Sequence, residues 1–190
     1  MASSVPSLWL ARHGETEWTI SRQHTGRTDL DLTAAGEAVA RDELAPKLAG
    51  VEFALVLSSP LRRALETARL AGFEPLLDER LREFDYGEYE GLTTAEIQRE
   101  RPDWDLWTDG CPGGETADDV GARMDALIAE RLSDADERVL LFGHGHALRI
   151  LTARWLGLPA REGRVVVLPT AALGITGTEH GRPVIERWGV

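Results

Sequence analysis

Cysteine is almost absent from the sequence, since Cys111 is the only one among 190 residues. A single cysteine excludes an internal disulfide bond and any zinc site built from several thiolates. Long apolar runs are absent too, because no stretch approaches the roughly 20 apolar residues of a membrane-spanning helix. The first residues also lack the charged segment that opens a signal peptide. These absences predict a cytoplasmic protein without a membrane-spanning segment.

Positive charge is scarce as well. Lysine and arginine number 21 against 32 aspartate and glutamate residues, which gives a formal net charge of −11 and an isoelectric point near 4.9. Nucleic acids and anionic membranes bind proteins through clustered excess lysine and arginine. We therefore expect neither as a partner. A phosphate site in this chain has to be a local basic pocket within an acidic protein.

Linkers and internal repeats are also missing. With 43% hydrophobic and 28% charged residues, a chain of this length can bury one substantial core. We therefore expect a single domain over residues 1–190.

What the sequence does contain is an alternation of short apolar runs and amphipathic segments. Strands are predicted at 7–12 and 53–59, helices at 32–50, at 59–72 and after Thr116, and a strand, a glycine-flanked turn and a helix over 138–158. This alternation is typical of an α/β fold with a mainly parallel sheet and helices on both faces. The tail at 164–190 favours antiparallel strands, which we expect at an edge of the sheet.

Three polar clusters lie next to predicted strand ends: Arg12 with His13, Arg62 with Arg63, and His-Gly-His at 144–146. Ligands of open α/β sheets bind beyond the carboxyl ends of the strands, so the clusters can meet in one crevice. A neutral imidazole such as that of His13 can attack phosphorus. Arginines at a helix start can hold phosphate oxygens together with the free N–H groups there. Two plainer interpretations stay open: a strand-end histidine held by hydrogen bonds, and one arginine on a solvated helix face.

Transfer of a phosphoryl group also needs an acid that protonates the departing oxygen. The loop around residues 81–91 offers four carboxyl groups, those of Glu83, Asp85, Glu88 and Glu90, among aromatic residues and glycines. Apolar neighbours can keep a carboxyl group protonated towards neutral pH. Composition does not choose among the four.

The segment at 144–146 also allows a metal-site interpretation, because alternate histidines at a strand end are a ligand pattern of metallohydrolases. No dense set of acidic ligands and no further cysteines accompany His144 and His146. We therefore expect no bound metal. Gly145 instead allows a ligand to approach the backbone closely.

Four segments in chain order, LARHGETEW, SSPLRRALETA, LREFDYGEYEG and FGHGHALR, closely resemble the signature segments of the histidine phosphatase superfamily, the phosphoglycerate-mutase-like group. The resemblance covers nearly the whole chain and implies a three-layer phosphoglycerate mutase-like fold. It implies that His13 becomes phosphohistidine, and that Arg12, Arg62 and His144 complete the phosphate pocket. It further implies that Glu83 donates the proton and then activates water, with no metal or other cofactor.

Within this group the segments look closest to acid phosphatases of actinobacterial type and sedoheptulose-bisphosphatases, and the chain is too short for the insertion and tail of cofactor-dependent mutases. We therefore expect a phosphatase of small-molecule phosphate monoesters, such as sugar phosphates. A phosphoglycerate mutase, a phosphoprotein phosphatase and a phosphate-sensing module without turnover stay as alternatives. Many members carry asparagine where this chain has Thr19. The further substrate contacts that we expect are Thr19, Thr25, Gly26, Tyr86, Gly145 and Arg149.

The stretch WDLWTDGCPGGET contains Trp104, Trp107 and Cys111. It is either a packed loop, in which the cysteine is a small buried hydrophobe, or a cover that shapes substrate choice. We favour the cover. A homodimer stays open, because the sequence does not distinguish an exposed edge strand from a paired one.

Overall fold

The computed structural model describes residues 6–132 and 137–190, so residues 1–5 and 133–136 of the expected domain lie outside the described part. Its sheet is built from β1 (Leu8–Arg12), β2 (Leu55–Ser58), β3 (Leu76–Leu77), β4 (Val139–Gly143), β5 (Leu173–Glu179) and β6 (Arg182–Trp188). The strand order is β3-β2-β4-β1-β5-β6. The first four strands in this order are parallel, whereas β5 pairs antiparallel with β1, and β6 with β5. The prediction of a mainly parallel sheet with an antiparallel edge is confirmed.

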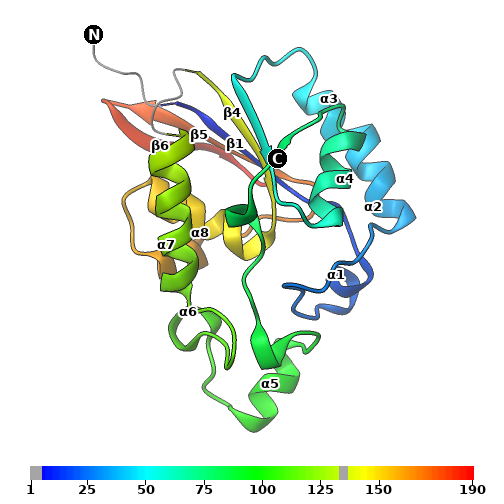
Figure 1. Ribbon diagram of the computed structural model, residues 1–190, viewed down its shortest axis with the longest axis vertical. Coiled ribbons are helices and arrows are strands. Elements are labelled where there is room, and N and C mark those ends of the chain that lie inside the picture. The colour runs from blue at the N-terminus through cyan, green and yellow to red at the C-terminus, as the bar shows by residue number, and fades with distance from the viewer. Residues whose placement is uncertain (1–5, 133–136) are drawn as a thin grey trace.

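Helices cover both faces of this sheet (Figure 1). On one face lie α2 (Ala34–Val39), α3 (Ala45–Leu48) and α4 (Arg62–Leu70), and on the other lie α7 (Ala117–Leu127) and α8 (Gly145–Trp155). Lower in the view of Figure 1 are α1 (Glu17–Ser21), α5 (Thr94–Glu100) and α6 (Leu106–Asp109). Short helical turns are η1 (Ala40–Leu44), η2 (Glu79–Leu81), η3 (Gly87–Tyr89), η4 (Ile128–Leu132) and η5 (Ala160–Val165). Within the described ranges, no helix is both long and apolar enough to cross a bilayer.

The strand β4 shows why helices are needed on both faces. Val139 and Leu141 belong to the core cluster that includes the buried residues of α7 and α8, whereas Leu140 and Phe142 belong to the cluster beneath α3 and α4. All four side chains are fully buried. Burial of each such side chain contributes about 1.5–3 kcal/mol. A strand that is buried on both faces is a continuous apolar run without alternation, which is the pattern that β4 shows in the sequence.

The segment predicted as one helix over 32–50 is interrupted. Thr33 caps its start, because the Thr33 hydroxyl accepts the N–H of Gly36 at 3.0 Å. Between α2 and α3, however, η1 is a π-helical turn in which the N–H of Ala45 reaches the carbonyl of Ala40. Pro46 has no N–H, and its ring crowds the carbonyl four residues earlier. The wider turn places Pro46 in the first turn of α3, where no such bond is required.

The parallel strands in the middle of the sheet end at nearly the same level. The last residue of β1 pairs with the last residue of β4, and the last residue of β2 pairs with Phe142, one residue before the end of β4. The residues that follow these strands therefore emerge side by side at one edge of the sheet: His13, Ser59 and His144.

The chain after β1 is fixed by a close backbone contact with the start of α2. A Cβ atom on Gly36 would lie 2.4 Å from the carbonyl oxygen of Glu15, and one on Gly14 would lie 2.7 Å from the carbonyl oxygen of Gly36. Thr33 adds two hydrogen bonds to Glu15, from its N–H to the carbonyl (2.9 Å) and from its hydroxyl to the carboxylate (2.7 Å). Only glycine leaves room for this contact, so α2 holds the segment next to His13 in place.

Gly36→Ala tests this contact. Alanine favours a helix interior over glycine by about 1 kcal/mol, but its Cβ would displace the Glu15 backbone. We therefore expect the free energy of unfolding, measured in urea, to fall by about 1–3 kcal/mol. Ala35→Gly at the exposed neighbouring position reports helix propensity alone and should cost up to about 1 kcal/mol. A Gly36→Ala protein that is more stable than the wild type would contradict the close contact.

Candidate active site

The side chains that follow β1, β2 and β4 meet at the carboxyl edge of the sheet. His13 donates its backbone N–H to the carbonyl of Gly143, and Ser59 donates its own to the carbonyl of Phe142, both at 3.0 Å. Nε2 of His144 lies 2.8 Å from the hydroxyl of Ser59. The imidazole rings of His13 and His144 have centroids 5.2 Å apart. The structure thus brings these two predicted histidines together.

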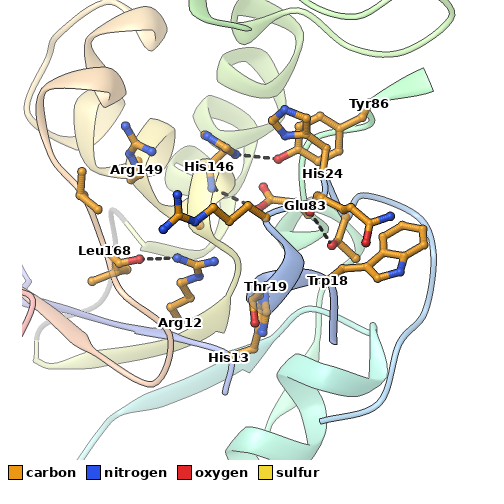
Figure 2. A pocket seen from close by; sticks show the side chains of 15 residues that line it. Arg12, His13, Trp18, Thr19, His24, Glu83, Tyr86, His146, Arg149 and Leu168 are labelled. Atoms are coloured by element: carbon orange, nitrogen blue, oxygen red, sulfur yellow. Dashed lines mark hydrogen bonds between the residues drawn. The ribbon is translucent and has the colours of Figure 1, made fainter. Parts of the chain in front are cut away.

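A cavity of about 250 Å³ opens next to His13 (Figure 2). Eight of the predicted site residues line it: Arg12, His13, Thr19, Thr25, Glu83, Tyr86, Gly145 and Arg149. Three others do not line it: Gly26, Arg62 and His144. The lining is completed by residues that were not among the predicted contacts: Trp18, Arg22, Gln23, His24, His146, Val167 and Leu168.

His13 is buried and uncharged. Its Nδ1 lies 2.7 Å from the carbonyl oxygen of Gly14. A carbonyl oxygen only accepts, so this contact assigns the proton to Nδ1 and leaves the lone pair of Nε2 unprotonated. Burial lowers the pKa of His13 well below its ordinary value, and the positive charges of Arg63 and Arg12 lower it further. The imidazole therefore has the protonation state that a nucleophile needs.

The guanidinium of Arg12 lies at the cavity in a space that Gly145 leaves open. Its Nη1 donates to the carbonyl of Leu168 at 2.7 Å (Figure 2). A Cβ atom on Gly145 would lie 3.2 Å from the guanidinium carbon of Arg12, so a larger residue at this position would crowd the guanidinium. Nε of Arg12 is buried and has no hydrogen-bond partner among the described residues. The guanidinium is thus anchored by a carbonyl but keeps its charge available for an anion.

The structure does not bring Arg62 to the cavity. Its side chain is 59% exposed and pairs with Asp31 at 2.8 Å and with Asp29 at 3.4 Å. These two carboxylates neutralise the guanidinium on the outer surface of α4. The plainer interpretation, one arginine on a solvated helix face, describes this residue.

Arg63, the next residue, is fully buried. Its guanidinium donates to the carbonyls of Thr28 (2.9 Å), Thr25 (3.1 Å) and Gly26 (3.0 Å). After burial itself, its charge is the largest influence that lowers the pKa of His13. Successive residues of a helix point about 100° apart, so only one of two adjacent arginines can face the site. The sequence marked both arginines but did not show which one faces inwards.

Of the four carboxyl groups in the loop after η2, only that of Glu83 belongs to a residue that lines the cavity. Asp85 forms an ion pair with Arg27 at 2.6 Å. Glu90 accepts backbone N–H groups from the chain around residues 26–28, and Glu88 is exposed. The geometry therefore selects Glu83 as the candidate acid, which composition alone did not do.

The Glu83 carboxylate sits on the N-terminus of α8. It accepts the backbone N–H groups of Ala147 (2.9 Å) and His146 (3.1 Å), and that of Phe84 (2.8 Å). The helix end offers these N–H groups because they have no partner within the helix. The carboxyl oxygens are thereby held in fixed positions beside the cavity.

Arg123 of α7 holds the backbone of the same residue from the other side. It donates to the carbonyls of Glu83 (3.1 Å) and Arg82 (2.8 Å) and to that of Arg80. It also pairs with Glu115 at 2.9 Å. No motif in the sequence marks this contact, because Arg123 lies 40 residues from Glu83 on a helix outside the four motifs.

Aromatic rings form one wall of the cavity. The hydroxyl of Tyr86 lies 2.6 Å from Nδ1 of His146, and the rings of Tyr86 and His24 have centroids 4.7 Å apart (Figure 2). Burial lowers the pKa of both histidines, that of His146 well below its ordinary value. The wall therefore offers hydrogen-bonding groups without adding charge.

The stretch expected to cover the site lies behind this wall instead. Trp104 is buried and donates its indole N–H to the carbonyl of Gly110 at 2.9 Å. Trp107 packs edge-on against His146, with centroids 5.3 Å apart, and neither tryptophan lines the cavity. Burial raises the pKa of the Cys111 thiol to about 12, so the thiol stays protonated within the core. The packed-loop interpretation fits these residues better than the cover.

Thr19 and Gly26 have their hydrogen-bonding groups occupied. The Thr19 hydroxyl donates to the carbonyl of Thr16 (2.8 Å) and accepts the N–H of the same residue (2.9 Å). The N–H of Gly26 donates to the Glu90 carboxylate at 2.9 Å. A Cβ atom on Gly26 would lie 2.5 Å from the carbonyl oxygen of Phe84, so this glycine allows the close packing of two backbones.

The two histidines of the segment 144–146 contact different neighbours. His144 contacts Ser59, whereas His146 contacts Tyr86. In the part of the chain that the structure describes, no group of three or more histidine, cysteine or acidic residues is arranged to hold a metal ion.

We expect His13, His144 and His146 to stay neutral in the folded protein at a pH where free imidazoles are protonated. Burial is the main cause that lowers the pKa of all three. In the urea-unfolded chain the imidazoles should titrate near a pKa of about 6.5, whereas ¹⁵N NMR of the folded protein should show neutral rings at that pH.

The difference between the histidine pKa in the folded protein and in the unfolded chain also predicts how stability depends on pH. Below about pH 6.5 the unfolded chain binds more protons than the folded protein, so the free energy of unfolding falls as the pH falls. Each of these histidines contributes up to about 1.4 kcal/mol per pH unit until its folded pKa is reached. If one of these three imidazoles becomes protonated near pH 6.5 in the folded protein, that histidine makes no such contribution to the pH dependence, and the prediction for it is wrong.

The chain is similar to known proteins over most of its length. A family model described as the histidine phosphatase superfamily (branch 1) matches residues 8–190. An acid phosphatase of Mycobacterium tuberculosis is 45% identical, over 92% of this chain and 87% of that protein. Sedoheptulose 1,7-bisphosphatase of Saccharomyces cerevisiae is 37% identical, over 85% of this chain and 72% of that protein. The solved structure of an open reading frame product of M. tuberculosis has a TM-score of 0.89 and 43% identity, covers 97% of both chains, and confirms the expected phosphoglycerate mutase-like fold.

Proposed function

The chain belongs to the histidine phosphatase superfamily, and we propose that it hydrolyses small-molecule phosphate monoesters through a phosphohistidine on His13. The family match and the similarity to an acid phosphatase and a bisphosphatase identify it as a phosphoric monoester hydrolase. The observation that carries the role of His13 is its neutral imidazole, held by the Gly14 carbonyl at Nδ1 with Nε2 unprotonated at the cavity.

The scissile phosphoryl group is assigned to Arg12, Arg63 and His144. Nε of both arginines and Nδ1 of the histidine are buried without a hydrogen-bond partner among the described residues. A buried polar group without a partner costs about 1–3 kcal/mol, and phosphoryl oxygens at this place would offset that cost. Arg63 takes the role that the motif suggested for Arg62, because Arg62 is neutralised outside the cavity.

The reaction then runs in two steps. In the first, Nε2 of His13 attacks phosphorus, the bond to the ester oxygen breaks, and Glu83 gives its proton to that oxygen. In the second, Glu83 takes a proton from water, the resulting hydroxide attacks phosphorus, and the bond to His13 breaks to release inorganic phosphate. The protein contributes position and charge stabilisation, which supply most of the rate in phosphoryl transfer.

The dimensions of the cavity favour small substrates over phosphoproteins. A volume of about 250 Å³ beside a wall of Tyr86, His24 and His146 suits a short polyol or sugar chain, whose hydroxyl groups can bond to the wall. Phosphoglycerate mutase stays the alternative, since a mutase shares the first step and returns the phosphoryl group to another hydroxyl. Product analysis separates the two activities. The single domain, the cytoplasmic location, the homodimer and the absence of nucleic acid and membrane partners stay predictions from the sequence.

Trapping the phosphoenzyme tests the proposal. Incubation with ³²P-labelled phosphate ester should label wild-type protein with an acid-labile, base-stable group, and His13→Ala should show neither label nor phosphate release. Glu83→Gln should still be labelled by nitrophenyl phosphate, whose leaving group needs little acid help. Its hydrolysis should slow by about a hundredfold to ten-thousandfold, so that the label accumulates.

Two results of this experiment would reject the mechanism. One is phosphate release by His13→Ala at the wild-type rate, with thermal melting showing that both proteins are folded. The other is loss of activity after exhaustive chelation that zinc or manganese restores, because the proposed chemistry uses no divalent metal.

The adjacent arginines provide a matched pair of variants. Arg63→Gln should lower kcat/KM for phosphate release by about a hundredfold to a thousandfold, the usual effect of removing one charge-stabilising donor. Arg62→Gln removes the same charge one residue earlier and should change kcat/KM by no more than about twofold, because exposed ion pairs contribute little. Thermal melting of both variants checks folding. A larger loss in Arg62→Gln than in Arg63→Gln would reverse the assignment.

A further inference from the structure

The cavity carries more positive charge than one phosphoryl group uses. Arg12, Arg22 and Arg149 line it together with a single carboxylate residue, Glu83. In the described part of the chain, none of these three arginines has a carboxylate oxygen within 4.0 Å, although ion pairs hold many arginines elsewhere. The histidines of the lining are uncharged because burial lowers the pKa of each. A chain of net charge −11 thus contains a cavity with three guanidinium groups against one carboxylate.

Arg149 marks the end of the cavity that lies away from the nucleophile. Figure 2 shows Arg149 at the upper left of the cavity and His13 at its lower end. Its Nε donates to the carbonyl of Gly163 at 2.9 Å, and its guanidinium carbon lies 4.5 Å from the ring centre of Trp107. A carbonyl and an aromatic face orient a guanidinium without neutralising it. The group is fixed in place and keeps its charge.

Arg22 also lines the cavity, from a backbone position that does not suit it. It caps the C-terminus of α1 in the left-handed conformation, with φ of 63° and ψ of 27°. Glycine is the usual residue there, because a Cβ atom makes this conformation costly. The residue is exposed and lines the cavity. Its backbone role would be filled better by glycine, so the presence of arginine points to a use for the side chain.

We propose that Arg22 and Arg149 bind a second anionic group of the substrate, and that the preferred esters carry a phosphate or carboxylate remote from the scissile phosphate. This inference rests on the proposed function, because it takes the scissile phosphate to be at His13. Arg12 already faces that phosphate, so a neutral sugar monophosphate would leave the other two guanidinium groups without a counter-charge. Guanidinium forks match the oxygens of phosphate and carboxylate groups.

Matched substrate pairs test the subsite. Fructose 1,6-bisphosphate is compared with fructose 1-phosphate and fructose 6-phosphate, and 3-phosphoglycerate with glycerol 3-phosphate. The measured quantity is the ratio of kcat/KM for phosphate release between the ester with the second anion and its partner. In the wild type this ratio should be about tenfold to a hundredfold for at least one pair. Arg22→Gly and Arg149→Gln should each lower it about threefold to tenfold, and the double variant should bring it near one.

Two controls separate charge recognition from damage to the fold. Arg22→Gly introduces the residue that the left-handed position prefers, so its melting temperature should equal or exceed that of the wild type. Arg27→Gln removes a nearby arginine whose side chain is 77% exposed, pairs with Asp85 and does not line the cavity. The ratio should not change in this variant.

The outcomes distinguish this inference from the proposed function. A ratio near one in the wild type, or an unchanged ratio in both arginine variants, overturns the subsite if monophosphates are still hydrolysed. Failure to release phosphate from every ester, together with no phosphohistidine, overturns the proposed function instead. A raised ratio in only one of the two pairs supports the subsite and identifies the second anion as phosphate or as carboxylate.

Discussion

The parallel pairing of β1 with β4, and of β4 with β2, is the constraint on which the rest of the site depends. The ladder sets the ends of the three strands at nearly one level, and the next residue of each emerges at the same edge. His13, Ser59 and His144 are therefore neighbours although they are far apart in the sequence. A slip of one residue would turn every side chain of a strand to the other face, which the apolar clusters on both faces oppose. Packing of the core thereby positions His13.

Three arginines near His13 and the cavity, Arg12, Arg63 and Arg149, are anchored by neutral groups. Arg12 donates to a carbonyl, Arg63 to three carbonyls, and Arg149 to two carbonyls beside an aromatic ring. Arg62, in contrast, is held by carboxylates on the surface. A carboxylate partner would cancel the charge that an anionic substrate needs, whereas a carbonyl fixes the geometry and leaves the charge. Burial of His13 and the positive charges of Arg63 and Arg12 lower its pKa and keep the imidazole neutral.

Glu83 shows how a loop residue acquires a fixed position. Its carboxylate rests on the N–H groups at the start of α8, and its carbonyl is held by Arg123 of α7. Both helices cover the same face of the sheet (Figure 1). Two helices therefore hold Glu83, one through its side chain and the other through its backbone. A group that donates and accepts protons at a defined position needs such rigid support.

The sequence by itself determined the local structure and the chemistry of this protein. Apolar runs determined the strands, N-cap threonines determined the starts of α2, α5 and α7, and four ordered motifs predicted a set of phosphoryl-transfer residues. Tertiary structure alone decided the place of each member of that set. Arg63 and not Arg62 is buried where its charge lowers the pKa of His13, and Glu83 is the one of the four loop carboxyl residues that lines the cavity. It also decided that Arg22 lines the cavity. The reason is geometric, because neighbouring residues have nearly the same local sequence but point into different surroundings, and only the packing of distant segments determines those surroundings.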